Sequence, residues 1–137
     1  MNREELTTTL PQADRAGVFS LPAHDIATLV EVAAAGNFAV FRVSLGGCTE
    51  SSEVLARLGE QLHFPDWFGQ NWDALADCLS DFSWREAAGY ALVLEQLGDF
   101  RAAGDDDFDT LIEILSDASA SWSVMGIPFW AFLVLEA

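Results

Sequence analysis

Three runs of apolar residues determine which folds are open to this chain. They are Phe38–Ser44, Tyr90–Glu95 and Phe129–Leu135, and in each of them apolar side chains follow one another with few polar interruptions. Such strands are typical of parallel sheets in which both faces are covered. Helical patterns separate the runs along the chain, as the crossover connections of a parallel sheet require. We therefore predict an α/β fold with a three-stranded parallel sheet packed with helices.

The N-terminal part predicts further elements. Gly17–Leu21 is a candidate edge strand, and Ala23–Ala35 has a helical pattern. Residues 1–16 are polar and aperiodic, which predicts a flexible N-terminus. Because 137 residues can bury a substantial core, we expect residues 17–137 to form a single domain.

Two helices are expected between the strands, in addition to the acidic helix described below. The first covers Glu53–Leu62, with Thr49 or Ser51 as its N-cap. The second runs from about Asp107 to Trp122, and its inward residues are expected to be Leu111, Ile112, Ile114 and Leu115.

Three aspartates follow one another at four-residue intervals on a further predicted helix. Asn71 is a suitable N-cap for this helix, and Asp73, Asp77 and Asp81 then form one stripe along it. Like charges at this spacing destabilise a helix by about 0.2–0.5 kcal/mol per pair. The pattern is compatible with a solvated acidic face and also with a functional site, where local rules are often broken. The opposite side is apolar and comprises Trp72, Leu75, Ala76, Cys78, Leu79 and Phe82.

The charge of the chain restricts its partners. Six Arg, no Lys and 22 acidic residues give a formal net charge of -16. Such a chain repels nucleic acid and anionic membranes and attracts basic proteins. We expect a cytoplasmic protein, because no signal peptide is evident and no apolar stretch reaches the length of a membrane span.

The sequence contains little that indicates catalysis or a cofactor. His24 and His63 lie in different segments without the spacing of a zinc site. Asp105–Asp109 is acidic but lacks the glycine and ligand spacing of an EF-hand, so a helix N-terminus is the simpler interpretation. Asp73 and Asp77 could form a carboxylate pair for glycoside hydrolysis, but adjacent turns of one helix suit that chemistry poorly. We expect no enzyme activity, no metal and no cofactor.

The two cysteines predict no disulfide framework. Cys48 and Cys78 are too few for a stapled scaffold of this length. Cys78 lies on the apolar side of the acidic helix, where a reduced thiol packs as a small hydrophobic group.

Aromatic residues precede the acidic helix. Trp67 and Phe68 lie in a predicted loop, and Gly69 permits a tight or left-handed backbone there. Aromatic side chains beside carboxylates suit docking into a cationic pocket of another protein. The alternative is that Trp67 packs on its own domain.

The stretch Phe64–Phe82 resembles the barstar family, the intracellular inhibitors of guanyl-specific ribonucleases. The resemblance is based on two motifs, Pro65-Asp-Trp-Phe-Gly-Gln-Asn71 and Asp73-Ala-Leu-Ala-Asp-Cys-Leu79. The resemblance covers roughly residues 38–136 and makes residues 17–37 an N-terminal extension. It implies a barstar-like fold in which a loop and an acidic helix block the ribonuclease cleft, with carboxylates where RNA phosphates would bind.

The resemblance also implies roles for individual residues. Trp67 corresponds to an aromatic residue that covers the cleft, Asp73 and Asp77 correspond to two interface aspartates, and Asp77 is the central phosphate mimic. The set of implied partner-binding residues is Trp67, Phe68, Gly69, Asn71, Asp73, Ala76, Asp77 and Asp117.

The sequence departs from the best-known member at two positions of this helix. Ala76 stands where that protein has an interface tryptophan, and Asp81 stands where it has glycine. The implied partner is a basic, secreted, barnase-like ribonuclease bound one-to-one by a monomer. The alternative is an acidic module of the same fold that binds another basic protein or toxin.

Overall fold

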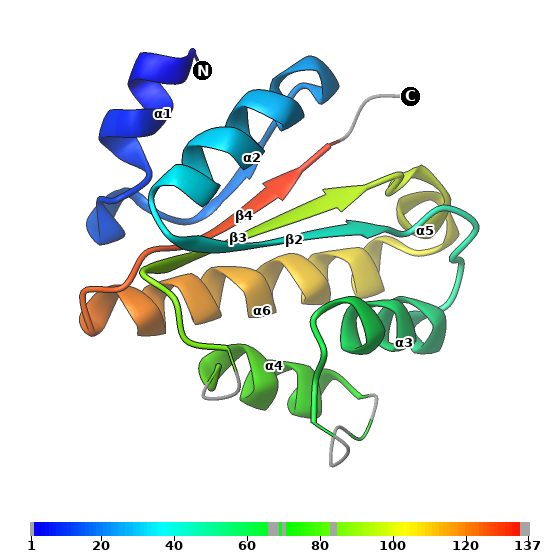
Figure 1. The fold of residues 1–137 in the computed structure, drawn as a ribbon. Helices are drawn as coiled ribbons and strands as arrows, with labels where there is room; N and C mark the ends of the chain where they lie inside the picture. Colours follow the sequence, from blue (N-terminus) through cyan, green and yellow to red (C-terminus); the bar gives the residue numbers. More distant parts are fainter. Residues whose placement is uncertain (1, 66–68, 70, 83–84, 135–137) are drawn as a thin grey trace.

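The protein is a parallel sheet with helices on both faces (Figure 1). This computed structural model describes residues 2–65, 69, 71–82 and 85–134. The four strands are β1 (Val18–Ser20), β2 (Phe38–Ser44), β3 (Gly89–Glu95) and β4 (Phe129–Leu133), in the order β1-β4-β3-β2 with every pair parallel. The predicted α/β fold, its three core strands and the N-terminal edge strand are confirmed.

The central strands are continuously apolar because each of their two faces packs against a separate hydrophobic cluster. Along β3, Tyr90, Leu92 and Leu94 join one cluster, whereas Ala91 and Val93 join the other. This alternation follows from the two-residue period of a strand. In β4 the same alternation places Phe129 and Trp130 on opposite faces.

One face of the sheet carries the N-terminal helices. They are α1 (Arg3–Thr9) and α2 (Ile26–Ala35), which pack against each other above the strands in Figure 1. A 3-10 turn at Ala23–Asp25 begins the segment that was predicted as one helix from Ala23.

The other face carries the remaining helices, which include the acidic one. They are α3 (Ser51–Gln61), α4 (Trp72–Ser80), α5 (Gly98–Ala103) and α6 (Asp105–Val124). The long helix α6 packs on the sheet, and α4 packs on α6, farther from the strands (Figure 1). The acidic helix is therefore an outer element, and one of its sides is left open.

Three local expectations are corrected. Residues 1–16 are not aperiodic: they contain α1 and a 3-10 turn at Ala13–Arg15, because Leu6 and Leu10 lie one turn apart and are both buried. The N-terminus of α3 is capped by Glu50 and Glu53 rather than by Thr49 or Ser51. The Glu53 carboxylate accepts a hydrogen bond of 3.3 Å from the Glu50 N–H, as in a capping box.

The third correction concerns the region after β3. The short helix α5 was not predicted, and α6 begins at Asp105 rather than near Asp107. Its first turn holds Asp105, Asp106 and Asp107, where the helix dipole favours negative charge. Leu111 and Leu115 are fully buried as expected, whereas Ile112 and Ile114 are only partly buried.

Candidate partner-binding face

The helix α4 turns its carboxylates to solvent because its other side is buried. Leu75 and Leu79 are at most 1% exposed and belong to the cluster between the sheet and α6. Asp73 and Asp77 are exposed on the opposite side, as the spacing predicted. On adjacent turns, their Cβ atoms lie about 5–6 Å apart, which suits two contacts with one cationic site.

The start of α4 is held by the predicted cap. The Asn71 side-chain oxygen accepts a hydrogen bond of 2.8 Å from the Ala74 N–H. A Cβ atom added at Gly69 would lie 3.2 Å from the Asn71 amide nitrogen, so glycine leaves room for this cap. Ala76 is partly buried. Trp67 and Phe68 lie outside the described residues.

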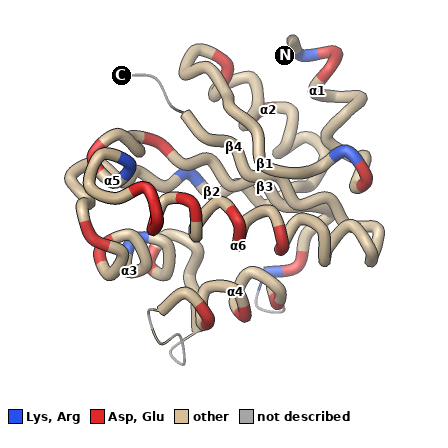
Figure 2. The backbone as a smooth tube through the Cα atoms, turned by 180° about the vertical axis from the view of Figure 1, so that it is seen from behind, with Lys and Arg blue, Asp and Glu red and all other residues tan. Residues whose placement is uncertain are grey.

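A second acidic stripe lies on α6. Asp109, Glu113 and Asp117 are exposed and follow one another at four-residue intervals, on the side of α6 away from Leu111 and Leu115. The acidic positions of α4 and α6 run beside each other on one side of the molecule (Figure 2). The sequence prediction singled out Asp117 alone, although this stripe has the same spacing as Asp73 and Asp77.

No basic residue occurs in α4 or α6. The ion pairs among the described residues join Arg3 to Glu31, His24 to Asp25, and Arg42 to Glu95, all of them away from these two helices. We name the surface formed by Asp73, Asp77, Asp109, Glu113 and Asp117 the acidic face. None of these ion pairs neutralises a carboxylate of the acidic face.

Cys78 is a structural residue of α4. It is fully buried and reduced, like Cys48, as predicted for Cys78. The pKa of the Cys78 thiol is raised to about 11, chiefly because the thiol is buried and in addition because the negative charges of Asp77 and Asp81 lie nearby. A thiol of this kind is a poor nucleophile at neutral pH.

The histidines do not form a shared site. His24 contacts Asp25 at 3.5 Å, whereas His63 follows α3 and lines a pocket with Arg42 and Arg85. Among the described residues, no group of three or more His, Cys, Asp or Glu side chains could hold a metal ion. Within the same ranges, none of the helices is long and apolar enough to cross a membrane.

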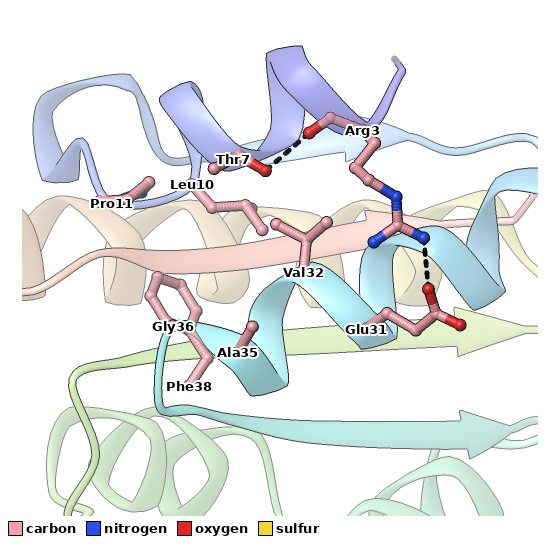
Figure 3. Close-up of a pocket in the computed structure, with 9 residues that line it drawn as sticks. All are labelled: Arg3, Thr7, Leu10, Pro11, Glu31, Val32, Ala35, Gly36 and Phe38. Carbon is pink, nitrogen blue, oxygen red and sulfur yellow. Dashed lines mark hydrogen bonds and ion pairs between the residues drawn. The ribbon is translucent and has the colours of Figure 1, made fainter.

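A pocket of about 310 Å³ lies far from the acidic face, between α1 and α2 (Figure 3). Leu10, Val32 and Phe38 contribute apolar side chains to it, and Arg3 is bound to Glu31 at its edge. Because this ion pair neutralises the charge at the edge, the pocket shows no clear preference for an ionic ligand.

Comparison with protein families matches residues 38–134 to Barstar (barnase inhibitor). The chain belongs to the barstar family. The match extends from β2 to the end of β4 and includes α4 and α6, whereas α1, β1 and α2 precede it. A search of curated proteins returned no match. The resemblance noted in the sequence is thus confirmed, and the family is one of inhibitors rather than enzymes.

Proposed function

We propose that this protein inhibits a basic, guanyl-specific, barnase-like ribonuclease by occupying its active site with the segment Phe64–Asn71 and α4. The proposal rests on the positions of Asp73 and Asp77. Both carboxylates are exposed on the outer side of a helix that belongs to the family match, and within the described residues neither forms an ion pair.

The chemistry of recognition follows from the substrate that such an enzyme binds. A ribonuclease site must hold the RNA phosphate with cationic side chains, and the same side chains bind carboxylates through charge-assisted hydrogen bonds. In this proposal Asp77 takes the place of the central phosphate and Asp73 binds a neighbouring cation. Asp117 on α6 adds a contact at the side.

The remaining proposed contacts have supporting roles. Asn71 holds the first turn of α4 through its cap, and Gly69 leaves the space that the cap requires. Trp67 and Phe68 provide apolar area over the cleft. Ala76, in place of a larger side chain, leaves room for a bulkier group of the enzyme, which favours a cognate enzyme with a different surface at that point.

The packing of α4 on α6 limits the cost of binding. Because the buried side of α4 fixes the helix before the partner arrives, little conformational entropy remains to be lost there. The net charge of -16 should also raise the association rate with a basic enzyme. We propose a one-to-one complex formed by a monomer whose residues 17–137 are one domain, with residues 17–37 as an extension of the family core.

Titration of ribonuclease activity tests this proposal. Increasing amounts of the protein are added to barnase at a fixed concentration, and cleavage of a fluorogenic guanosine-containing RNA is followed. We expect activity to fall linearly to zero at one equivalent, as blocking of the active site requires. Tight binding measured by calorimetry without loss of activity would favour the alternative, an acidic module that binds another surface or another basic protein.

A further inference from the structure

A pocket of about 460 Å³ lies where α4 and α6 end. It lies between the C-terminus of α4 at Ser80, the C-terminus of α6 at Val124 and the beginning of β3. We name it the helix-end pocket. Asp81, which is not among the proposed contacts, lies at its edge.

The electrostatics of the helix-end pocket favour a cation. Two helices direct their C-termini, which carry partial negative charge, toward it, and neither has a basic residue in its last turn. Two exposed carboxylates, Asp81 and Glu86, add full negative charges. The nearby Arg85 donates to the Glu86 carbonyl oxygen at 3.1 Å and lines a different pocket.

The floor of the pocket favours an apolar group. The rings of Phe82, Tyr90 and Trp122 pack against one another in a triangle, in which the Tyr90 centroid lies 4.5 Å from that of Phe82 and 5.2 Å from that of Trp122. The polar atoms of these rings are already used, because the Tyr90 hydroxyl donates to the Arg85 carbonyl and the Trp122 indole donates to the Leu79 carbonyl. What remains toward the pocket is aromatic carbon, which suits an aliphatic stem or the face of a guanidinium group.

The edge of the pocket includes Met125, a large apolar residue that is 60% exposed. A flexible thioether of this kind adapts to an incoming side chain. Carboxylates at one edge and apolar atoms at the floor and the other edge match one type of ligand, a long side chain with a cationic end.

We propose that the helix-end pocket binds an arginine or lysine side chain of the basic partner, as a second contact beside the acidic face. Asp81 and Glu86 bind the cationic end, and the aromatic floor and Met125 contact the stem. Asp73 and Asp81 are eight residues apart, or about 12 Å along a helix. One partner of ordinary interface size, about 800 Å² on each protein, can cover both. The identity of the partner rests on the proposed function, whereas the cation preference rests on the pocket alone.

The pocket can be tested without a ribonuclease. N-acetyl-arginine amide is titrated into the isotope-labelled protein and followed by NMR, with the isosteric but neutral N-acetyl-citrulline amide as the control ligand. We expect shift changes at the amides of Asp81, Glu86, Met125 and Ile127 for the arginine compound only. Shift changes spread equally over all acidic segments, or equal effects of the two ligands, would overturn the inference.

Two variants sharpen this test. Met125→Arg places a positive charge at the edge of the pocket, whereas Val124→Arg adds the same charge one residue earlier, at a position that is 89% exposed and does not line the pocket. We expect Met125→Arg to weaken binding of the arginine compound at least about fivefold and Val124→Arg to change it less than about twofold. Equal effects of both variants would show general charge repulsion and would contradict a defined pocket.

Calorimetry with barnase separates this inference from the proposed function. Asp81→Asn combined with Glu86→Gln should weaken the complex about tenfold. If this double variant binds normally while Asp77→Ala does not, the second contact is wrong and the proposed inhibitor stands. If the wild type binds the arginine compound at the pocket but does not bind barnase, the cation site stands and the proposed target is wrong.

Discussion

The indole N–H of Trp122 donates a hydrogen bond of 2.7 Å to the carbonyl oxygen of Leu79. Both side chains are buried, and the bond joins the last turn of α6 to the last turn of α4. The last carbonyl groups of a helix have no partner within that helix, so an outside donor satisfies one of them here. This hydrogen bond thus adds to the packing of α4 on α6 and helps to position the C-terminal end of the candidate binding helix.

Trp122→Phe should therefore affect both stability and binding. The variant leaves the buried Leu79 carbonyl without its donor, and we expect the free energy of unfolding to fall by about 1–3 kcal/mol. Because α4 loses this hydrogen bond to α6 at its C-terminal end, barnase affinity should fall too. Denaturant unfolding and calorimetry measure the two effects.

Trp130→Phe is the matched control. Its indole N–H donates to the Leu10 carbonyl at 2.9 Å, also in a buried position, but on the face of the sheet that carries α1 and α2. We expect a similar loss of stability and an unchanged affinity. Equal losses of affinity in the two variants would show that the Trp122 bond does not position the binding helix in particular.

A glycine in β3 should be essential to the sheet. A Cβ atom at Gly89 would lie 2.6 Å from the ring of Phe38, which crosses over this position from β2. We expect Gly89→Ala to lower the free energy of unfolding by about 1–3 kcal/mol through overpacking. Gly98→Ala, where nothing lies within 4 Å, should be close to neutral. A neutral Gly89→Ala in thermal unfolding would contradict the observed contact.

Leu6 should support the fold without contributing to the binding face. Its side chain is fully buried in the cluster that α1 and α2 form with one face of the sheet, on the opposite side from α4 (Figure 1). We expect Leu6→Ala to lower the free energy of unfolding by about 2–5 kcal/mol and to leave the affinity of the folded protein for barnase unchanged. Unchanged stability would instead restore the earlier expectation of a loose N-terminus.

Cys78 should be unreactive in the folded protein and should make stability depend on pH at the alkaline end. Its pKa is raised from the ordinary value of 9.0 to about 11, so the folded state favours the protonated thiol. This contribution is complete below about pH 9 and is lost as the pH rises through about 11, since the unfolded chain releases its proton first.

Two measurements check this expectation. Iodoacetamide at pH 8 should label Cys78 only after the protein is denatured. The decrease in stability between pH 9 and 11 should be smaller in Cys78→Ala than in the wild type. Rapid labelling of the native protein would contradict the burial of this thiol.

The strands and the acidic helix could be predicted because their patterns are long and chemically simple. β2 has its predicted bounds, and α4 begins at the predicted cap Asn71. α1 could not be predicted in this way, because only Leu6 and Leu10 mark its buried side within a polar segment. The same holds for α5, which has six residues and a single buried one, Phe100.

Only part of the candidate site could be predicted from the sequence. Spacing predicted the shared face of Asp73 and Asp77, since the helical period alone decides it. The helix-end pocket depends instead on the meeting of α4, α6 and β3, which are far apart in the chain. The four-residue spacing of Asp109, Glu113 and Asp117 could be recognised in the sequence. That these residues lie beside α4 could not be predicted, because it depends on how α6 packs against α4.

The contribution of Asp77 to the complex tests the central claim most directly. Calorimetry would compare the binding of barnase to the wild type, to Asp77→Ala and to Glu4→Ala, which removes the same charge from α1 on the opposite face of the sheet. We expect Asp77→Ala to lose about 2–5 kcal/mol of binding free energy, or at least about 30-fold in Kd, and Glu4→Ala less than about twofold. A loss below about 1 kcal/mol for Asp77→Ala, similar to that of Glu4→Ala, would contradict a buried phosphate mimic on α4.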